Sequence, residues 1–168
     1  MKIKELMNKS AVQSCTPETR LHNAAKVMRK ANCGALPVVN GKNQVVGIVT
    51  DRDICLSLAD KKKSPSRVRV HEVMTPNAVT VNANQELAVA LHEMRTRKVG
   101  RLPVVDKSGK LQGIISLHGL LSTSAGDKKA FDAANTSGES ILKTVKAITD
   151  RYTGEVKKKK KADRAVTM

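Results

Sequence analysis

The apolar residues of this chain form short blocks with two different spacings. Residues 36–39 and 45–49 are apolar runs of strand length and predict two strands. The second run is interrupted by one glycine, and it predicts a strand that is covered on both faces. Residues 40–43 between them have the composition of a hairpin turn. The buried face of a helix, opened by Thr16 and Pro17, is predicted from the spacing of Leu21, Ala24, Ala25 and Met28.

The remaining elements are predicted from the same spacings. A short N-terminal helix would bury Ile3, Leu6 and Met7, a first strand covers 11–14, and a helix after Asp53 contains Ile54, Cys55 and Leu58. The second half predicts strands over 79–81, 102–105 and 111–116, helices over 87–94 and 117–121, and a turn at 106–109. Residues 122–138 have loop composition. A capping box of Thr136 and Glu139 then opens a helix that carries Ile141, Val145, Ile148 and Tyr152 and ends at Gly154.

The chain contains an internal duplication. Leu-Pro-Val-Val at 36–39 returns at 102–105, and Gly-Ile-Val-Thr at 47–50 returns as Gly-Ile-Ile-Ser at 113–116. The two copies align from Leu21 and Leu87 onward at a constant offset of 66 residues, whereas Glu5-Leu6-Met7 matches residues 72–74 at an offset of 67. One order of strands and helices is therefore present twice.

This order resembles a tandem pair of cystathionine-β-synthase (CBS) domains, also called a Bateman module, over about residues 1–122. The resemblance implies an α/β (α+β) fold in which two βαββα repeats pack with pseudo-two-fold symmetry. We expect repeat 1 at 1–60, a basic linker at 61–70, repeat 2 at 71–122, and a loop, amphipathic helix and lysine-rich tail at 123–168. A homodimer is expected from the same resemblance.

Composition limits the possible functions. The two aromatic residues, Phe131 and Tyr152, lie outside the repeats, so an aliphatic core is expected. The three cysteines have no Cys-x-x-Cys spacing and the four histidines no metal-ligand spacing, which favours reduced thiols and no metal site. No apolar run is long enough to span a membrane, and we expect a soluble cytoplasmic protein.

The net charge of +16 is spread along the chain. Residues 1–121 carry 20 Lys/Arg and 9 Asp/Glu, and residues 122–168 carry 11 and 6. Such a charge attracts polyanions. The lysine run at 157–161 therefore supports an alternative function as a nucleic-acid-associated protein, although no aromatic residues are placed to stack on bases.

The candidate site lies where the strand at 45–49 ends. Thr50 follows that strand, and Asp51 and Asp53 fall in the first turn of the next helix, where carboxylates suit the positive end of the helix dipole. Free backbone N–H groups, a hydroxyl and a carboxylate at this point can together hold a sugar or a phosphate. The same residues can equally act as a helix cap without a ligand.

The resemblance assigns a ligand to this site. CBS pairs hold an adenosyl ligand (AMP, ADP, ATP or S-adenosylmethionine) in clefts between the repeats, with the Thr/Ser and Asp near the ribose. Thr50 and Asp53 match fully, whereas Ser116 is followed by Gly119 where the family has Asp. In the alignment of the two copies, Arg101 corresponds to Ala35 and His118 corresponds to Arg52. Family members often use basic residues at the Arg101 and His118 positions to reach the phosphates of the ligand.

One intact cleft is therefore expected, with Thr50, Asp53, Arg101, His118 and backbone near Val79, and one degraded cleft with Ser116 and Arg52. No residue pattern supports catalysis, so we expect no enzyme activity. The leading hypothesis is an adenine-nucleotide sensor that acts in trans on an unknown protein. The nucleic-acid alternative and a ligand-free scaffold remain open.

Overall fold

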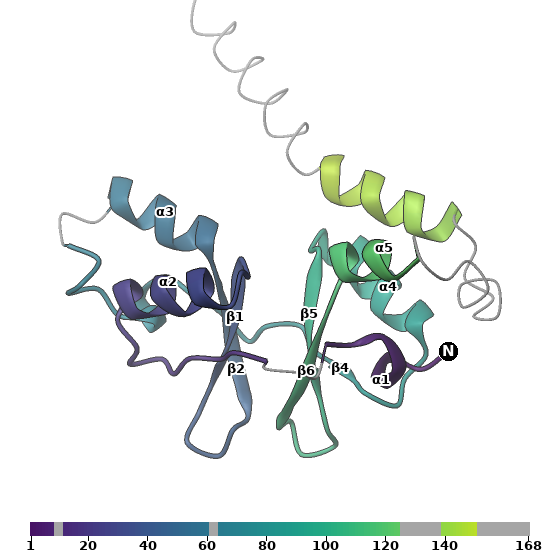
Figure 1. Ribbon diagram of the computed structural model, residues 1–168, viewed down its shortest axis with the longest axis horizontal. Coiled ribbons are helices and arrows are strands. Elements are labelled where there is room, and N and C mark those ends of the chain that lie inside the picture. The colour runs from purple at the N-terminus through teal and green to yellow at the C-terminus, as the bar shows by residue number, and fades with distance from the viewer. Residues whose placement is uncertain (9–11, 61–63, 125–138, 151–168) are drawn as a thin grey trace, which may run out of the picture. The chain divides into compact units, whose positions relative to one another are not determined.

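The computed structural model describes residues 1–8, 12–60, 64–124 and 139–150 (Figure 1). The elements follow in the order α1 (Ile3–Leu6), α2 (Leu21–Lys30), β1 (Ala35–Val39), β2 (Val45–Thr50), α3 (Asp51–Asp60), η1 (Val70–Glu72), β3 (Thr75–Pro76), β4 (Val81–Asn82), α4 (Leu87–Arg97), β5 (Arg101–Val105), β6 (Leu111–Ser116) and α5 (Leu117–Ser124). A further helix occupies 139–150. No helix within these ranges is long and apolar enough to cross a membrane.

The chain divides into two compact units that do not follow the order of the repeats. The α2–α3 unit consists of residues 8–83 and 103–114, and the α4–α5 unit of 1–7, 84–102 and 115–168. The boundary between the two units cuts β5 after Leu102 and β6 before Ile115. Two three-stranded sheets have the orders β1-β2-β3 and β4-β5-β6, which gives the mixed α/β class expected from the sequence.

The α2–α3 unit is built on the antiparallel hairpin of β1 and β2, with α2 and α3 along one side of it (Figure 1). All five residues of β1 are buried. In β2 only Gly47 and Val49 are buried and the other residues are half-buried, so the predicted coverage of both faces of this strand is only partial. Its core is formed by Cys15, Leu21, Ala24, Met28, Leu36, Val38, Val49, Val68 and Val70.

The α4–α5 unit buries the apolar stripe of α4 that helical spacing predicts. Its core contains Ile3, Leu87, Ala90, Leu91, Met94, Leu102, Ile115, Leu120 and Ile141. Helix 139–150 buries Ile141 and Thr144, and the Thr144 hydroxyl donates to the Ser140 carbonyl oxygen (2.8 Å). The predicted C-terminal helix is therefore present, whereas Thr136, Tyr152 and Gly154 lie outside the described residues.

Each unit contains an entry segment from one repeat and a helix from the other. In the α4–α5 unit, the Ile3 N–H donates to the Gln85 carbonyl oxygen (2.9 Å). In the α2–α3 unit, the equivalent Val70 N–H donates to the Thr19 carbonyl oxygen (2.8 Å). Thus α1 and η1 occupy equivalent places at the starts of α4 and α2.

The strands show the same exchange. Thr75 of β3 pairs with Ile48 of β2, and Asn8 forms the equivalent bridge with Ile114. Gly47 is required where β3 pairs with β2, because a Cβ at this position would lie 2.8 Å from the Thr75 carbonyl oxygen. The glycine of the repeated Gly-Ile-Val-Thr motif thus permits a close backbone approach.

Several predicted boundaries were wrong. The strand at 11–14 is absent over the described residues 12–14, and only an isolated parallel bridge between Cys15 and Val38 remains, equivalent to Val81–Val104 in β4 and β5. α2 begins at Leu21 rather than near Thr16, because residues 17–21 pair with 68–71. α5 continues to Ser124, beyond the predicted end at Leu121. Residues 79 and 80 precede β4 without belonging to it.

Candidate functional site at the helix starts

Thr50 and Asp53 form a reciprocal cap at the start of α3. The Asp53 Oδ2 accepts hydrogen bonds from the Thr50 N–H (2.8 Å) and from the Thr50 hydroxyl (2.7 Å). In return, the Asp53 N–H donates to the Thr50 Oγ1 (3.2 Å). Because α3 follows β2 without a connecting residue, the half-buried carboxylate is held directly at the end of the strand.

The second repeat has only half of this arrangement. The Gly119 N–H donates to the Ser116 Oγ (3.0 Å), as Asp53 does to Thr50. Glycine has no carboxylate to return the bond, so the start of α5 lacks the reciprocal acceptor. A Cβ at Gly119 would lie 3.1 Å from the Ser116 Oγ, a tight contact that a small movement of the serine side chain relieves.

Both helix starts are fixed to the strand before them by one main-chain bond. The Asp51 N–H donates to the Gly34 carbonyl oxygen (3.2 Å), and the Leu117 N–H donates to that of Gly100 (2.8 Å). These bonds place Ala35 beside the start of α3 and Arg101 beside the start of α5. The backbone of the two sites is therefore the same, and their side chains differ.

The predicted site residues fall in both compact units. Thr50, Asp53 and Val79, all half-buried, and the exposed Arg52 belong to the α2–α3 unit. The half-buried Arg101 and Ser116 and the exposed His118 belong to the α4–α5 unit. The structure brings together Thr50 with Asp53, and Arg101 with Ser116 at the start of α5.

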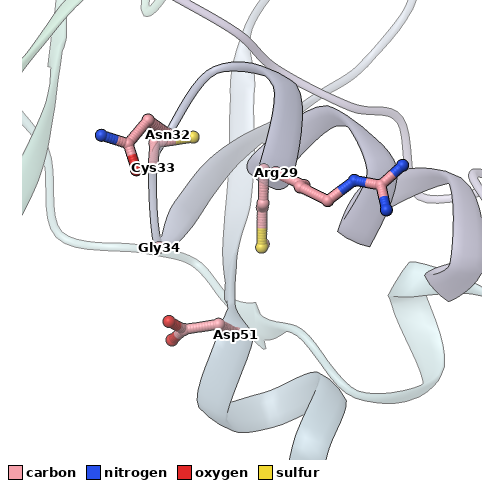
Figure 2. A pocket seen from close by; sticks show the side chains of 6 residues that line it. Arg29, Asn32, Cys33, Gly34 and Asp51 are labelled. Atoms are coloured by element: carbon pink, nitrogen blue, oxygen red, sulfur yellow. The ribbon is translucent and has the colours of Figure 1, made fainter.

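An open pocket of about 420 Å³ lies between the end of α2 and the start of α3 (Figure 2). It is lined by Met28, Arg29, Asn32, Cys33, Gly34 and Asp51. The Asp51 carboxylate accepts from the Arg52 N–H (2.8 Å) and so caps α3 from the exposed side. The sequence did not predict this pocket, which combines residues from a helix end and a helix start that are some twenty residues apart.

Thr50 and Asp53 offer a hydroxyl, a carboxylate and backbone N–H groups, all of which form hydrogen bonds. Within the described part of the chain, no group of three or more His, Cys, Asp or Glu side chains is close enough to hold a metal ion. The three cysteines are free thiols. A carboxylate fixed at the end of a strand, next to the N-terminus of a helix, can accept hydrogen bonds from hydroxyl groups of a ligand.

The family model of the CBS domain matches residues 3–60 and 70–126. The chain therefore belongs to the CBS domain family, as a tandem pair of repeats. It is 36% identical over 140 residues to the uncharacterized protein YlbB of Bacillus subtilis, a match that covers 82% of this chain and 92% of YlbB. It is also 31% identical over 117 residues to the uncharacterized protein MK0525 of Methanopyrus kandleri, but spans only 59% of that protein.

Solved structures of CBS pairs have the same fold. The CBS domain pair of protein MJ0100, in complex with 5′-methylthioadenosine and S-adenosyl-L-methionine, matches with a TM-score of 0.68 and 26% identity. That match covers 76% of this chain and 98% of the MJ0100 chain. CBSX2 of Arabidopsis thaliana in complex with AMP matches with a TM-score of 0.64 and 25% identity over 76% of this chain and 98% of the CBSX2 chain.

Proposed function

We propose that this chain is a regulatory module that binds one adenosyl nucleotide at the site marked by Thr50 and Asp53. The observation that carries the proposal is the difference between the repeats. Both helix starts have the same backbone bonds, but only the first has a carboxylate after the hydroxyl residue. The adenosyl ligands named for the MJ0100 pair and for CBSX2 support adenosine as the part of the ligand that is recognised.

The role of Asp53 follows from the number of bonds that a carboxylate can accept. Its Oδ2 already accepts two bonds from Thr50. Two carboxylate oxygens offer about four lone-pair sites, so the cap can persist while the carboxylate also accepts from both hydroxyls of a ribose. A ribose diol would thus find an acceptor whose position is already fixed, which reduces the entropy lost on binding.

The other site residues are assigned by resemblance to the family. We assign Arg101 and His118 to the phosphates of the same ligand and the backbone near Val79 to its adenine. Ser116 and Arg52 would belong to a second site that lacks a carboxylate because of Gly119. The positive charge of the Arg101 guanidinium favours a ligand with phosphate groups over S-adenosylmethionine.

The regulatory role would be exerted in trans. CBS repeats account for residues 3–60 and 70–126, so we propose a regulatory rather than a catalytic protein that acts on a protein target. Association into a homodimer stays a prediction. The free cysteines suit a reducing compartment and so a cytoplasmic location.

Equilibrium dialysis of the full chain against AMP, ADP, ATP and S-adenosylmethionine tests the proposal. We expect saturable binding of at least one ligand and its loss in Asp53→Asn. Asp51→Asn is the matched control, since it removes the same charge from the same helix turn without touching Thr50. Absence of binding by all four ligands, or equal binding by wild type and Asp53→Asn, would refute the proposed site.

A further inference from the structure

The solvent face of α2 carries three cations and no anion. The helix buries Leu21, Ala24 and Met28, and its exposed residues are His22, Asn23, Lys26, Arg29 and Lys30. The ten-residue helix contains no Asp or Glu. Positions four residues apart lie about 6 Å apart along a helix, so His22, Lys26 and Lys30 form a straight row with Arg29 beside it.

The internal duplication shows that this face is not a general property of the repeat. At the equivalent positions, α4 has Ala88, Val89, His92, Arg95 and Thr96. α4 also carries Glu93, which forms an ion pair with Arg97 (3.7 Å). The arginine is therefore present in both copies (Arg29 and Arg95), whereas Lys26 and Lys30 of α2 are replaced by His92 and Thr96 in α4.

The cations of α2 are not neutralised by the unit to which they belong. Among the described residues, neither Lys26, Arg29 nor Lys30 forms an ion pair, whereas Arg69 is paired with Glu18. Arg29 extends away from the Asp51 carboxylate on the opposite side of the pocket (Figure 2). Its guanidinium is therefore available to a ligand on the outer face of α2.

The chemistry of this face selects one kind of partner. A membrane-bound helix inserts its apolar face into the lipid, but the apolar face of α2 is buried in the core. A peptide-binding surface usually contains apolar or aromatic anchors, and none of the five exposed side chains is either. A row of Lys and Arg without apolar anchors matches the phosphate groups of a nucleic acid backbone.

We propose that the Lys26, Arg29 and Lys30 face of α2 binds the phosphodiester backbone of nucleic acid without reading its sequence. This surface is separate from Thr50 and Asp53, and it does not depend on the proposed nucleotide function. It also differs from the lysine run at 157–161, which lies outside the described residues. Side chains that contact only phosphates contribute affinity and salt dependence but no base preference.

The test measures binding of the full chain to a labelled duplex of about 20 base pairs by fluorescence anisotropy, between about 50 and 200 mM NaCl. The triple variant Lys26→Gln/Arg29→Gln/Lys30→Gln removes three cations. Each phosphate contact contributes about 0.9 to the slope of log affinity against log salt. We therefore expect the slope to fall by about 3, so that wild type loses about 40-fold more affinity than the variant over this range.

The matched control is Lys42→Gln/Lys107→Gln/Lys110→Gln, which removes three exposed cations of the same unit from its hairpin turns. We expect this control to change the slope by less than about 1. Equal slopes for the two triple variants would overturn the proposal in favour of net charge alone. An unchanged slope in the α2 variant would also overturn it. Polyglutamate that displaces the duplex as well as unlabelled duplex does would instead identify a site for acidic polypeptides.

Discussion

Substitution of Asp53 separates the cap of α3 from any role in ligand binding. Asp53→Ala removes the acceptor of two hydrogen bonds from Thr50, of 2.8 and 2.7 Å, in a half-buried position. Loss of such a cap costs about 1–2 kcal/mol. For a chain of this size the melting temperature would fall by about 3–6 °C.

Asp53→Asn keeps one oxygen that can accept both bonds from Thr50, but it removes the charge and replaces the second oxygen by an NH2 group. Asp53→Asn should therefore lose the stabilising interaction between the charge and the helix dipole, which contributes about 0.3–1 kcal/mol. Asp51→Asn should lose a similar amount of stability. Urea unfolding followed by far-ultraviolet circular dichroism measures all three variants. If Asp53→Ala is no less stable than Asp53→Asn, the hydrogen bonds of the cap contribute nothing and the structural reasoning is refuted.

Three other predictions test the packing. Gly47→Ala should destabilise the protein by about 1–3 kcal/mol because its Cβ meets the Thr75 carbonyl oxygen at 2.8 Å. Gly41→Ala, with no atom within 4 Å of its Cβ, should change stability by less than about 0.5 kcal/mol in the same urea titration; equal effects would contradict the close approach. Burial raises the pKa of the Cys15 thiol to about 11 from an unfolded value of 9.0, so its stabilising contribution is full below pH 9 and is lost as pH rises to about 11. A Cys15→Ala variant should lack this step of about 2–3 kcal/mol in its pH–stability profile, and an unchanged profile would show that the thiol is not buried as described. Ile141→Ala, in a side chain only 5% exposed, should cost about 2–4 kcal/mol, and Leu142→Ala, 69% exposed, less than about 0.5; similar thermal midpoints for the two would argue against docking of helix 139–150.

Local patterns predicted the elements that are determined locally. β6 occupies 111–116 as expected, since its apolar run and its following hydroxyl residue lie in one short segment. The sequence allowed a helix cap at Thr50, because capping depends on residues three positions apart. The same short range explains why the missing carboxylate at Gly119 could be identified from the alignment of the two copies.

The exchange of entry segments was not predicted because it joins residues that are far apart in the chain. Asn8 pairs with Ile114, and Ile3 donates to Gln85. Only the change of offset from 67 to 66 marked the point where each entry segment leaves its own repeat. The late start of α2 has the same origin, since pairing of residues 17–21 with 68–71 prevails over the helix-start preference of Pro17.

The basic face of α2 was missed because charge was summed over long segments. The excess of cations over residues 1–121 is given as one sum, which does not show that one ten-residue helix contains no carboxylate. Comparison of the two repeats position by position provides the signal, since Lys26 and Lys30 have neutral residues or histidine as their counterparts in α4.

The most direct test of the nucleotide site is the calorimetric stoichiometry of the best ligand for wild type, Asp53→Asn and Gly119→Asp. The account predicts one site per chain in wild type and none in Asp53→Asn, and allows a second site only in Gly119→Asp, where the missing carboxylate is restored. Two sites per wild-type chain, or one site that persists in Asp53→Asn, would contradict the assignment of binding to the single intact pair of Thr50 and Asp53.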